Sequence, residues 1–238
     1  MHGRRRRRVL CKRIIPTLLC KGYNLVKGKQ FSADRVVGNV IQAVEVYNLR
    51  WVDEIVLFDV EARALGRCIS KDLVMDVSVR NLVPLAVGGG ITTVKEAVEL
   101  IQNGADKVIV GTGKRVIPEI AKEMGSQAAV ACINYTTERE AVTAAKLYED
   151  LGAGEIILQC IDRDGMMNGY DLDTAFHVAS SVQIPVVLSC GAGTYQHLYE
   201  GLQLVDAVAA GAMWTFTDQT PREAKKYLKE KGVHVRTL

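Results

Sequence analysis

Glycine-rich turns follow four strand-like runs of this chain, and turns of this kind can bind phosphate. Glycine has no Cβ, so the main chain can approach a phosphate closely, and the N-terminus of a following helix offers free N–H groups. Two turns lie in each half of the chain, which predicts a ligand with a phosphate at each end. The alternative is that the glycines only permit tight turns. The residues predicted to bind phosphate are Gly90, Gly111, Thr112, Gly191, Gly193, Gly211 and Ala212.

Four charged residues stand at or beside the start of a strand-like run, namely Arg13, Glu54, Lys107 and Glu155. In a closed barrel of parallel strands they would all lie at the N-terminal end. Their two positive and two negative charges could then form a ring of ion pairs. Charged residues are also common at this solvated end, where a surface ion pair contributes at most about 1 kcal/mol.

The elements that must hold these residues alternate between strands and helices. Apolar spacing of the kind found in packed helices occurs over Val94–Gln102 and Ile117–Met124. Eight apolar strands, each followed by a helix, predict a closed parallel (β/α)8 TIM barrel, with an open doubly wound sheet as the alternative. The predicted strands are Arg13–Cys20, Glu54–Val60, Val83–Val87, Lys107–Val110, Ala128–Ile133, Glu155–Cys160, Val186–Ser189 and Ala207–Ala210.

The two halves of the chain are similar to each other. Val52–Leu57 is echoed by Ala153–Leu158, and residues 88–111 are echoed by residues 191–211, at a spacing of about 100 residues. The similarity covers strand, turn and helix together. It therefore favours a barrel built from two similar half-barrels.

Composition and charge indicate one globular domain with a basic start. The chain has 238 residues, of which 48% are hydrophobic and 24% charged. The formal net charge is +3, but Arg4 to Arg8 contribute five positive charges, so the remainder carries −2. No aromatic residues interleave with these arginines, which argues against nucleic-acid binding. We predict a basic, disordered tail over residues 1–12 and a single barrel domain over residues 13–238.

Six cysteines occur, and none forms a Cys-x-x-Cys pair. This usage favours buried thiols in a reducing compartment over a disulfide or metal framework. The arginine run is followed by only a short apolar pair, Val9 and Leu10, and no run approaches the length of a membrane span. We therefore predict a cytoplasmic protein with no cofactor, no metal site and no membrane contact.

A more specific signal comes from nine short segments. They are Arg13–Pro16, Val26–Gly28, Asp53–Asp59, Val87–Ile91, Gly104–Val108, Gly125–Gln127, Gly152–Ile156, Ile161–Gly165 and Gly169–Asp171. Together they resemble the cyclase subunit of imidazole glycerol phosphate synthase, over residues 13–235. The combination of Ile161–Gly165 with Gly169–Asp171 is highly specific for this family. The related sugar isomerase of histidine synthesis shares the barrel but fits these segments less well.

The resemblance implies a lyase. The cyclase joins ammonia to a phosphoribulosyl aminoimidazole substrate with two phosphates, and it yields imidazole glycerol phosphate and a carboxamide ribotide. The glycine turns of each half of the chain match one phosphate site, although the family usually has serine at the position of Ala212. Lys27 and Asp164 match residues beside the substrate.

The resemblance also implies a partner. In the family, the residues at the positions of Arg13, Glu54, Lys107 and Glu155 form the gate through which ammonia enters from a glutaminase subunit. Asp106 matches a residue that contacts this glutaminase. A glutaminase is therefore expected at the N-terminal barrel face, and a small phosphorylated substrate at the opposite end.

Two positions depart from the family. The cyclase has acid–base aspartates where this chain has Leu19 and Asn134, and neither side chain titrates. The family also usually carries a hairpin-like insertion after the second position, which is absent here. Proton transfer would then fall to other titratable groups, and Asp162 and Lys21 are two of the possibilities. The catalytic candidates are Asp164, Asp59 and Lys27.

Three functions stay open, and with them whether the chain is an enzyme. The first is a glutaminase-docking subunit that channels ammonia to altered chemistry, with or without a third amidotransferase component. Cyclase-like paralogues that help to aminate sugars of bacterial surface polysaccharides also have leucine at the position of Leu19 and a proline near Pro16. The second is a genuine cyclase with relocated acids. The third is a noncatalytic barrel that binds phosphate ligands.

Overall fold

The computed structural model describes residues 11–236. Arg4 to Arg8, and most of the predicted tail, lie outside the described residues. Among the described residues, Lys12 lies one position before the predicted domain start. Lys12 forms a β-bridge with Val235, and its Nζ donates to the carbonyl of Val205 at 2.7 Å.

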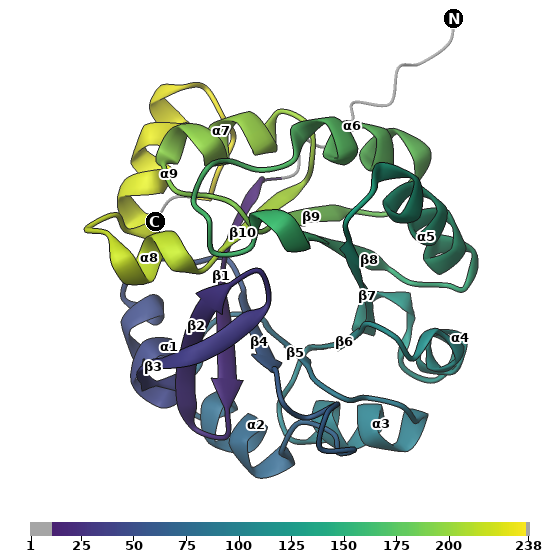
Figure 1. The fold of residues 1–238 in the computed structure, drawn as a ribbon. Coiled ribbons are helices and arrows are strands. Elements are labelled where there is room, and N and C mark those ends of the chain that lie inside the picture. The colour runs from purple at the N-terminus through teal and green to yellow at the C-terminus, as the bar shows by residue number, and fades with distance from the viewer. Residues whose placement is uncertain (1–10, 237–238) are drawn as a thin grey trace, which may run out of the picture.

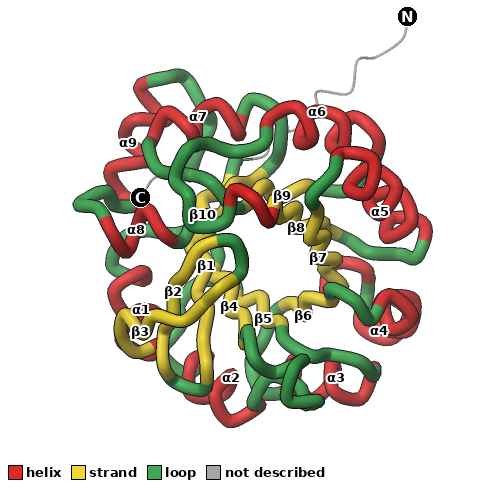
Figure 2. Tube along the Cα trace, viewed as in Figure 1, coloured by secondary structure: helices red, strands yellow, loops and turns green. Residues whose placement is uncertain are grey.

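The described chain forms a closed barrel of parallel strands surrounded by helices (Figures 1 and 2). Each barrel strand pairs with the next, and the last pairs with the first, so the (β/α)8 prediction is confirmed and the open sheet is excluded. The barrel strands are β1 (Arg13–Lys21), β4 (Ile55–Asp59), β5 (Leu85–Gly88), β6 (Lys107–Val110), β7 (Ala129–Tyr135), β8 (Glu155–Cys160), β9 (Val186–Ser189) and β10 (Ala207–Ala210).

The helices form the outer layer, and most begin at a polar side chain that accepts a backbone N–H. Thr137, for example, accepts from Glu140 N, as is usual at an N-cap. Both helices that the sequence predicted have the predicted bounds. The helices are α1 (Val40–Asn48), α2 (Lys71–Ser78), α3 (Val94–Gln102), α4 (Ile117–Met124), α5 (Glu138–Asp150), α6 (Leu172–Ser181), α7 (Tyr195–Leu202), α8 (Ala212–Phe216) and α9 (Pro221–Glu230).

An antiparallel hairpin that the sequence did not predict extends the first strand. It consists of β2 (Asn24–Lys29) and β3 (Ser32–Asn39), and β2 pairs with the end of β1. Gln30 and Phe31 form its turn with positive φ values of 49° and 64°. Figure 1 shows the hairpin in front of the barrel mouth. It therefore brings residues of β2 and β3 to the C-terminal end of the barrel.

The apolar interior has two layers. The larger layer lies between the strands and the helices. The smaller one fills the barrel itself, and Phe58 packs against it from the C-terminal side. The residues of this smaller layer are Ile15, Val56, Ala86, Ile109, Val130, Cys132, Ile157, Val187, Ala207 and Ala209. The barrel axis is thus apolar between two polar ends.

Candidate functional site

A cavity of about 440 Å³ opens at the C-terminal end of the barrel. Leu19 lines it from β1 and Asn134 lines it from β7. These strands stand opposite each other in the order of the closed sheet. Tyr135 ends β7 and α5 begins at Glu138, so no hairpin follows Asn134.

Most residues predicted to bind phosphate line this cavity in two groups. We call Gly90, Gly111 and Thr112 the first glycine site, and Gly191, Gly211 and Ala212 the second glycine site. Gly90 has φ of 65° and Gly191 has φ of 108°, which L side chains rarely adopt.

Gly193 is the exception among the predicted residues. It is not part of the cavity wall, and its N–H donates to His197 Nδ1 at 3.1 Å. A Cβ at this position would overlap the carbonyl oxygen of Met167. Gly193 therefore permits a close packing of two loops, which is the alternative that the sequence left open.

The N-terminus of α3, which follows the first glycine site, is capped in part by side chains of the protein itself. Thr93 accepts from Glu96 N, and Glu96 Oε2 accepts from the N–H groups of Thr92 and Thr93 at 2.9 Å. Although burial alone would raise the pKa of Glu96, these hydrogen bonds outweigh it and lower the pKa. These contacts engage the N–H groups of Thr92, Thr93 and Glu96, and within residues 11–236 the N–H groups of Val94 and Lys95 in the first turn have no hydrogen-bond partner.

Asp59, one of the catalytic candidates, holds a loop in place. Its Oδ1 accepts from the N–H groups of Glu61 and Ala62 at 3.2 and 3.1 Å, and its Oδ2 pairs with Arg67 Nη1 at 2.5 Å. The carboxylate lines the cavity but is fully engaged. Its geometry is that of an anchor for the loop after β4.

Lys27 and Asp164 both line the cavity. Lys27 is 5% exposed, and its Nζ donates to the carbonyl of Thr17 at 2.9 Å beside Gly211. Burial lowers the pKa of Lys27 to about 8, and the charge of Asp164 opposes this effect. Asp164 Oδ2 accepts from Phe31 N at 3.1 Å, so it also secures the hairpin turn.

Asp162 and Lys21, the other titratable groups that the sequence offers for proton transfer, lie outside the cavity wall. Asp162 is exposed and does not belong to the cavity wall. Lys21 also lies outside this wall, and its Nζ is 4.0 Å from Asp34 Oδ1 on the hairpin. Neither is placed for proton transfer in the cavity.

Uncharged polar groups form much of the cavity floor, and apart from Asn134 they are not among the site residues predicted from the sequence. The Cys132 thiol lies 3.1 Å from Gln159 Oε1 and 3.4 Å from Asn134 Oδ1. Thr17 Oγ1 is buried without a hydrogen-bond partner among the described residues. Burial raises the pKa of Cys132 to about 12, so the thiol stays protonated at neutral pH. These groups could have been predicted from polar residues that interrupt apolar strands, such as Gln159.

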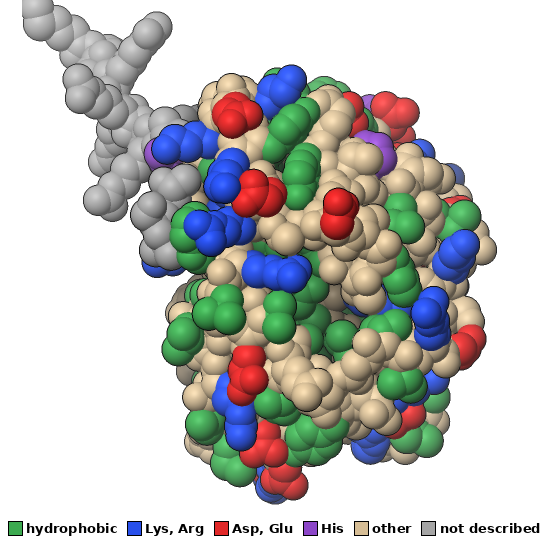
Figure 3. Space-filling model, turned by 90° about the vertical axis from the view of Figure 1, so that its left-hand side faces the viewer, with side chains coloured by type: hydrophobic (Ala, Val, Ile, Leu, Met, Phe, Trp, Pro, Cys, Tyr) green, Lys and Arg blue, Asp and Glu red, His purple; other side chains and the backbone are tan. Residues whose placement is uncertain are grey.

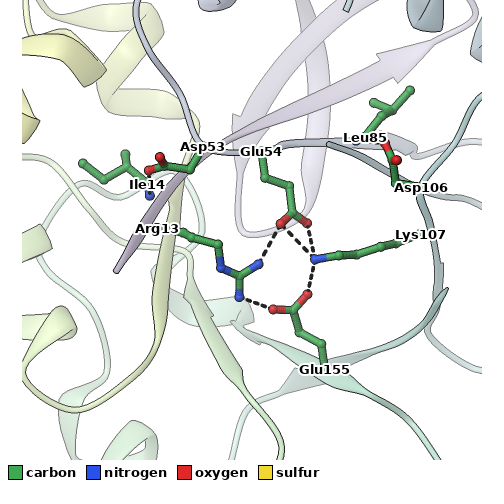
Figure 4. A network of polar contacts seen from close by, with 8 residues as sticks. All are labelled: Arg13, Ile14, Asp53, Glu54, Leu85, Asp106, Lys107 and Glu155. Atoms are coloured by element: carbon green, nitrogen blue, oxygen red, sulfur yellow. Dashed lines mark hydrogen bonds and ion pairs between the residues drawn. The ribbon is translucent and has the colours of Figure 1, made fainter. Parts of the chain in front are cut away.

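The four charged residues at the strand starts form the predicted ring at the opposite end of the barrel (Figure 4). Arg13 pairs with Glu54 at 2.7 Å and with Glu155, and Lys107 pairs with the same two carboxylates at 2.9 and 2.7 Å. Although burial would raise the pKa of Glu155, Arg13 and Lys107 hold it below its usual value. We call these four residues the charged ring. Three of the four residues, Arg13, Lys107 and Glu155, line a second cavity of about 380 Å³ at this end of the barrel.

Asp106 is exposed beside this ring, and its carboxylate has a local partner (Figure 4). Its Oδ2 accepts from Leu85 N at 2.8 Å. Asp206 accepts from Val186 N at 3.3 Å in the same way, which repeats the arrangement in the second half of the barrel. Asp106 thus ties two neighbouring strands together, whatever else it contacts.

Surface charge, helix length and possible metal ligands complete the description of residues 11–236. Positive and negative side chains are intermixed on the face shown in Figure 3, which lies over α1, α8 and α9. Within residues 11–236, no helix combines the length and apolar character needed to cross a membrane. The same residues contain no group of three or more His, Cys, Asp or Glu that could hold a metal ion.

Comparison with known proteins identifies similar chains. The model of the family described as histidine biosynthesis protein matches residues 13–218. The imidazole glycerol phosphate synthase subunit HisF of Chlorobium limicola is 39% identical, and the HisF subunits of Chloroherpeton thalassium and Chlorobaculum tepidum are 38% identical. Each alignment covers 96% of this chain and 100% of the relative.

Proposed function

Because the chain belongs to the histidine biosynthesis protein family, as a HisF-like cyclase subunit, we propose that it docks a glutaminase and channels ammonia to a phosphorylated substrate. We further propose that its chemistry differs from that of the cyclase. The observation that carries the proposal is the pairing of a closed charged ring at one end with Leu19 and Asn134 in the cavity at the other.

The apolar barrel axis supports a route for ammonia. Ammonia is mostly protonated in water at neutral pH, and ammonium is a poor nucleophile. An interior lined by residues such as Ile15, Val56 and Ile109 disfavours the charged form, because burying an unpaired ion is costly. Neutral ammonia that passes the charged ring would therefore reach the cavity floor in its reactive form.

An exposed apolar rim supports docking of a glutaminase at the N-terminal face. Leu49, Val79 and Leu82 are 78%, 77% and 83% exposed, in the loops that lead into β4 and β5. Asn48 joins these loops, since its amide donates to the Arg80 carbonyl at 2.7 Å and accepts from Leu82 N at 3.1 Å. Glu54 of the charged ring directly precedes β4. Contiguous exposed apolar residues often mark protein interfaces.

We expect Leu82→Asp to weaken binding of a glutaminase subunit encoded in the same genome by about tenfold or more, because a buried carboxylate at an interface is penalised. Sedimentation or calorimetric titration of the two purified chains measures this. Leu65→Asp is the matched control, since Leu65 is 62% exposed but follows β4 at the other end of the barrel. Equal affinity of both variants would contradict docking at this rim.

Asp106 requires a more careful variant than charge reversal. Asp106→Lys would remove the bond to Leu85 N as well as the charge. Asp106→Asn keeps an acceptor for this N–H, so a loss of binding in this variant would report the charge at the contact with the glutaminase.

The two glycine sites support a substrate with a phosphate at each end. The second site combines backbone groups at Gly211 and Ala212 with the ammonium group of Lys27, whereas alanine at position 212 offers no hydroxyl donor. Phosphate bound there would be held by main chain and by one buried cation.

We expect anion binding at the second glycine site to weaken as the pH rises through about 8, the pKa of Lys27. Only the protonated amine attracts an anion, so each pH unit above this value should lower the affinity by up to about tenfold. Sulfate is the suitable probe, because it does not titrate in this range, and calorimetry measures its binding. Lys27→Met should abolish the pH dependence, and the exposed Lys29→Met should keep it. Sulfate affinity that does not change with pH in the unmodified chain would refute this role of Lys27.

The proposal extends to the reaction that the chain supports and to its cellular location. The absence of both acid–base aspartates favours a reaction other than cyclisation, such as sugar amination in surface polysaccharide synthesis with a third amidotransferase component. A cytoplasmic location belongs to the same proposal. Turnover of candidate keto sugars with glutamine, the glutaminase and this chain tests it, and a product without nitrogen from glutamine would exclude it.

A genuine cyclase is the second candidate, and one observation favours it. Lys27 and Asp164, which match residues beside the cyclase substrate, both line the cavity. Turnover of the cyclase substrate with ammonium salt distinguishes this candidate from the first.

A further inference from the structure

The loop between β4 and α2, residues 60–70, lies directly on Gly90. A Cβ at Gly90 would overlap the carbonyl oxygen of Arg67 and lie 3.4 Å from the carbonyl carbon of Ala62. In addition, Ile69 N donates to the carbonyl of Gly89 at 2.8 Å. This loop, with Arg63 directly after Ala62, therefore forms one wall of the first glycine site.

The loop has a fixed conformation around Arg63. Asp59 accepts from two of its N–H groups and from Arg67. Within the loop, Gly66 N donates to the carbonyl of Arg63 at 3.1 Å, and Arg67 N donates to the carbonyl of Ala62 at 3.0 Å. The backbone that carries the Arg63 side chain is thus held in place before any ligand binds, which reduces the entropy lost on binding.

Arg63 is the uncommitted charge of the cavity wall. The charged side chains that line the cavity are Lys27, Asp59, Arg63, Arg67, Glu96 and Asp164. Five of them are engaged in the hydrogen bonds and ion pairs described above. Arg63 is exposed, and within residues 11–236 its side chain forms no hydrogen bond or ion pair. Its guanidinium can therefore bind a ligand without breaking an existing contact.

We propose that Arg63 is the cation of the first glycine site and that it selects a ligand with a phosphate monoester at this end. The inference rests on the proposed phosphorylated substrate and adds the residue that recognises it. A guanidinium can donate two parallel hydrogen bonds to phosphate, and such charge-assisted bonds are stronger than neutral ones. Arg63 would then serve the first glycine site as Lys27 serves the second, so each end of the cavity would have one cation that is not held in an ion pair.

Calorimetric titration with ribulose 1,5-bisphosphate, which has a phosphate at each end, tests the proposal. Arg63→Gln should weaken binding by about tenfold or more, the usual effect of losing a charged hydrogen-bond partner. Arg63→Lys should give an intermediate affinity, because lysine keeps the charge but not the paired donors. Arg139→Gln is the matched control, since Arg139 is an exposed arginine in the first turn of α5, at the same end of the barrel, outside the cavity wall.

The outcomes separate this inference from the proposed function. Weaker binding by Arg63→Gln, with unchanged binding by Arg139→Gln, supports the role of Arg63. If the unmodified chain binds the bisphosphate and Arg63→Gln binds it equally well, Arg63 is not the cation of the first glycine site. The proposal of a phosphorylated substrate is then unaffected. If the unmodified chain binds neither the bisphosphate nor inorganic phosphate, both the inference and the phosphate part of the proposed function are wrong.

Discussion

The chain should turn over the phosphoribulosyl aminoimidazole substrate of the cyclase, with ammonium salt as the nitrogen source, at least about 100-fold more slowly than a HisF subunit with both acid–base aspartates. A positioned acid or base contributes roughly 10²–10⁴-fold to a rate, and both positions lack a titratable group here. The HisF subunit of Chlorobium limicola, which is 39% identical to this chain, can be measured alongside once both aspartates have been located in its sequence. Turnover within tenfold of this reference would show that the acids have been relocated.

Restoring the two carboxylates provides the constructive version of this prediction. Leu19 and Asn134 both line the cavity, so Leu19→Asp with Asn134→Asp would place the carboxylates where a ligand binds. We expect a gain of about tenfold or more in cyclase turnover. Leu19→Asn is the matched control, because it adds a polar side chain of similar size that does not titrate. An equal gain from this control would mean that polarity, and not proton transfer, limits the reaction.

Loss of the buried ion pair beneath α9 should destabilise the fold strongly. Lys225 Nζ lies 2.5 Å from Asp53 Oδ1, and the two side chains are 3% and 6% exposed. Asp53 Oδ2 also accepts from Ile14 N at 2.8 Å, so this carboxylate links α9 to two barrel strands. Lys225→Met leaves Asp53 buried without its cation. Such a loss typically lowers the free energy of unfolding by about 3–5 kcal/mol, or the midpoint by roughly 6–20 °C.

The neighbouring lysine supplies the control for this change. Lys226 pairs with Glu223 at 2.9 Å, but these side chains are 54% and 50% exposed. Lys226→Met should therefore change the free energy of unfolding by less than about 1 kcal/mol. Thermal and urea denaturation of the two variants measure the difference. Similar stabilities of Lys225→Met and Lys226→Met would mean that the pair with Asp53 does not support the fold.

The barrel could be predicted because its local signals agree with one another. Short β-branched runs such as Lys107–Val110 and Val186–Ser189 alternate with amphipathic stretches such as Val94–Gln102, and the structure has all three elements with these bounds. The charged ring could be predicted for the same reason. Parallel strands start at one end of a barrel, so residues that open their strands must meet there.

The hairpin β2–β3 could not be read in the same way. Most of β3 is exposed, and neither strand has the continuous apolar run of a barrel strand. Its stability comes from pairing with the end of β1, a tertiary contact that no local pattern encodes. As a result, the contacts of Lys27 with Thr17 and Gly211 could not be predicted from the sequence either.

The roles of individual polar groups depend on partners far apart in the chain. Asp59 is a titratable residue at a strand end in the sequence, yet its contacts with Arg67 and two N–H groups make it a loop anchor. The glycines before α3 suggested a free helix terminus, yet Thr93 and Glu96 cap part of it. Such competition for hydrogen bonds is decided by geometry, so the sequence could supply the candidates but not their assignments.

The rate of glutamine hydrolysis by a glutaminase subunit encoded in the same genome, measured with and without this chain, tests the docking and channelling proposal most directly. Coupling between two sites is typically worth about 1–3 kcal/mol. If about 1 kcal/mol of it lowers the activation barrier, saturating amounts of this chain raise the rate by about fivefold, which is the minimum we expect. The Leu82→Asp chain should reach the same rate only at higher concentration. A hydrolysis rate that stays unchanged throughout a titration to large molar excess of the chain would contradict the proposal that this barrel receives its ammonia from a glutaminase.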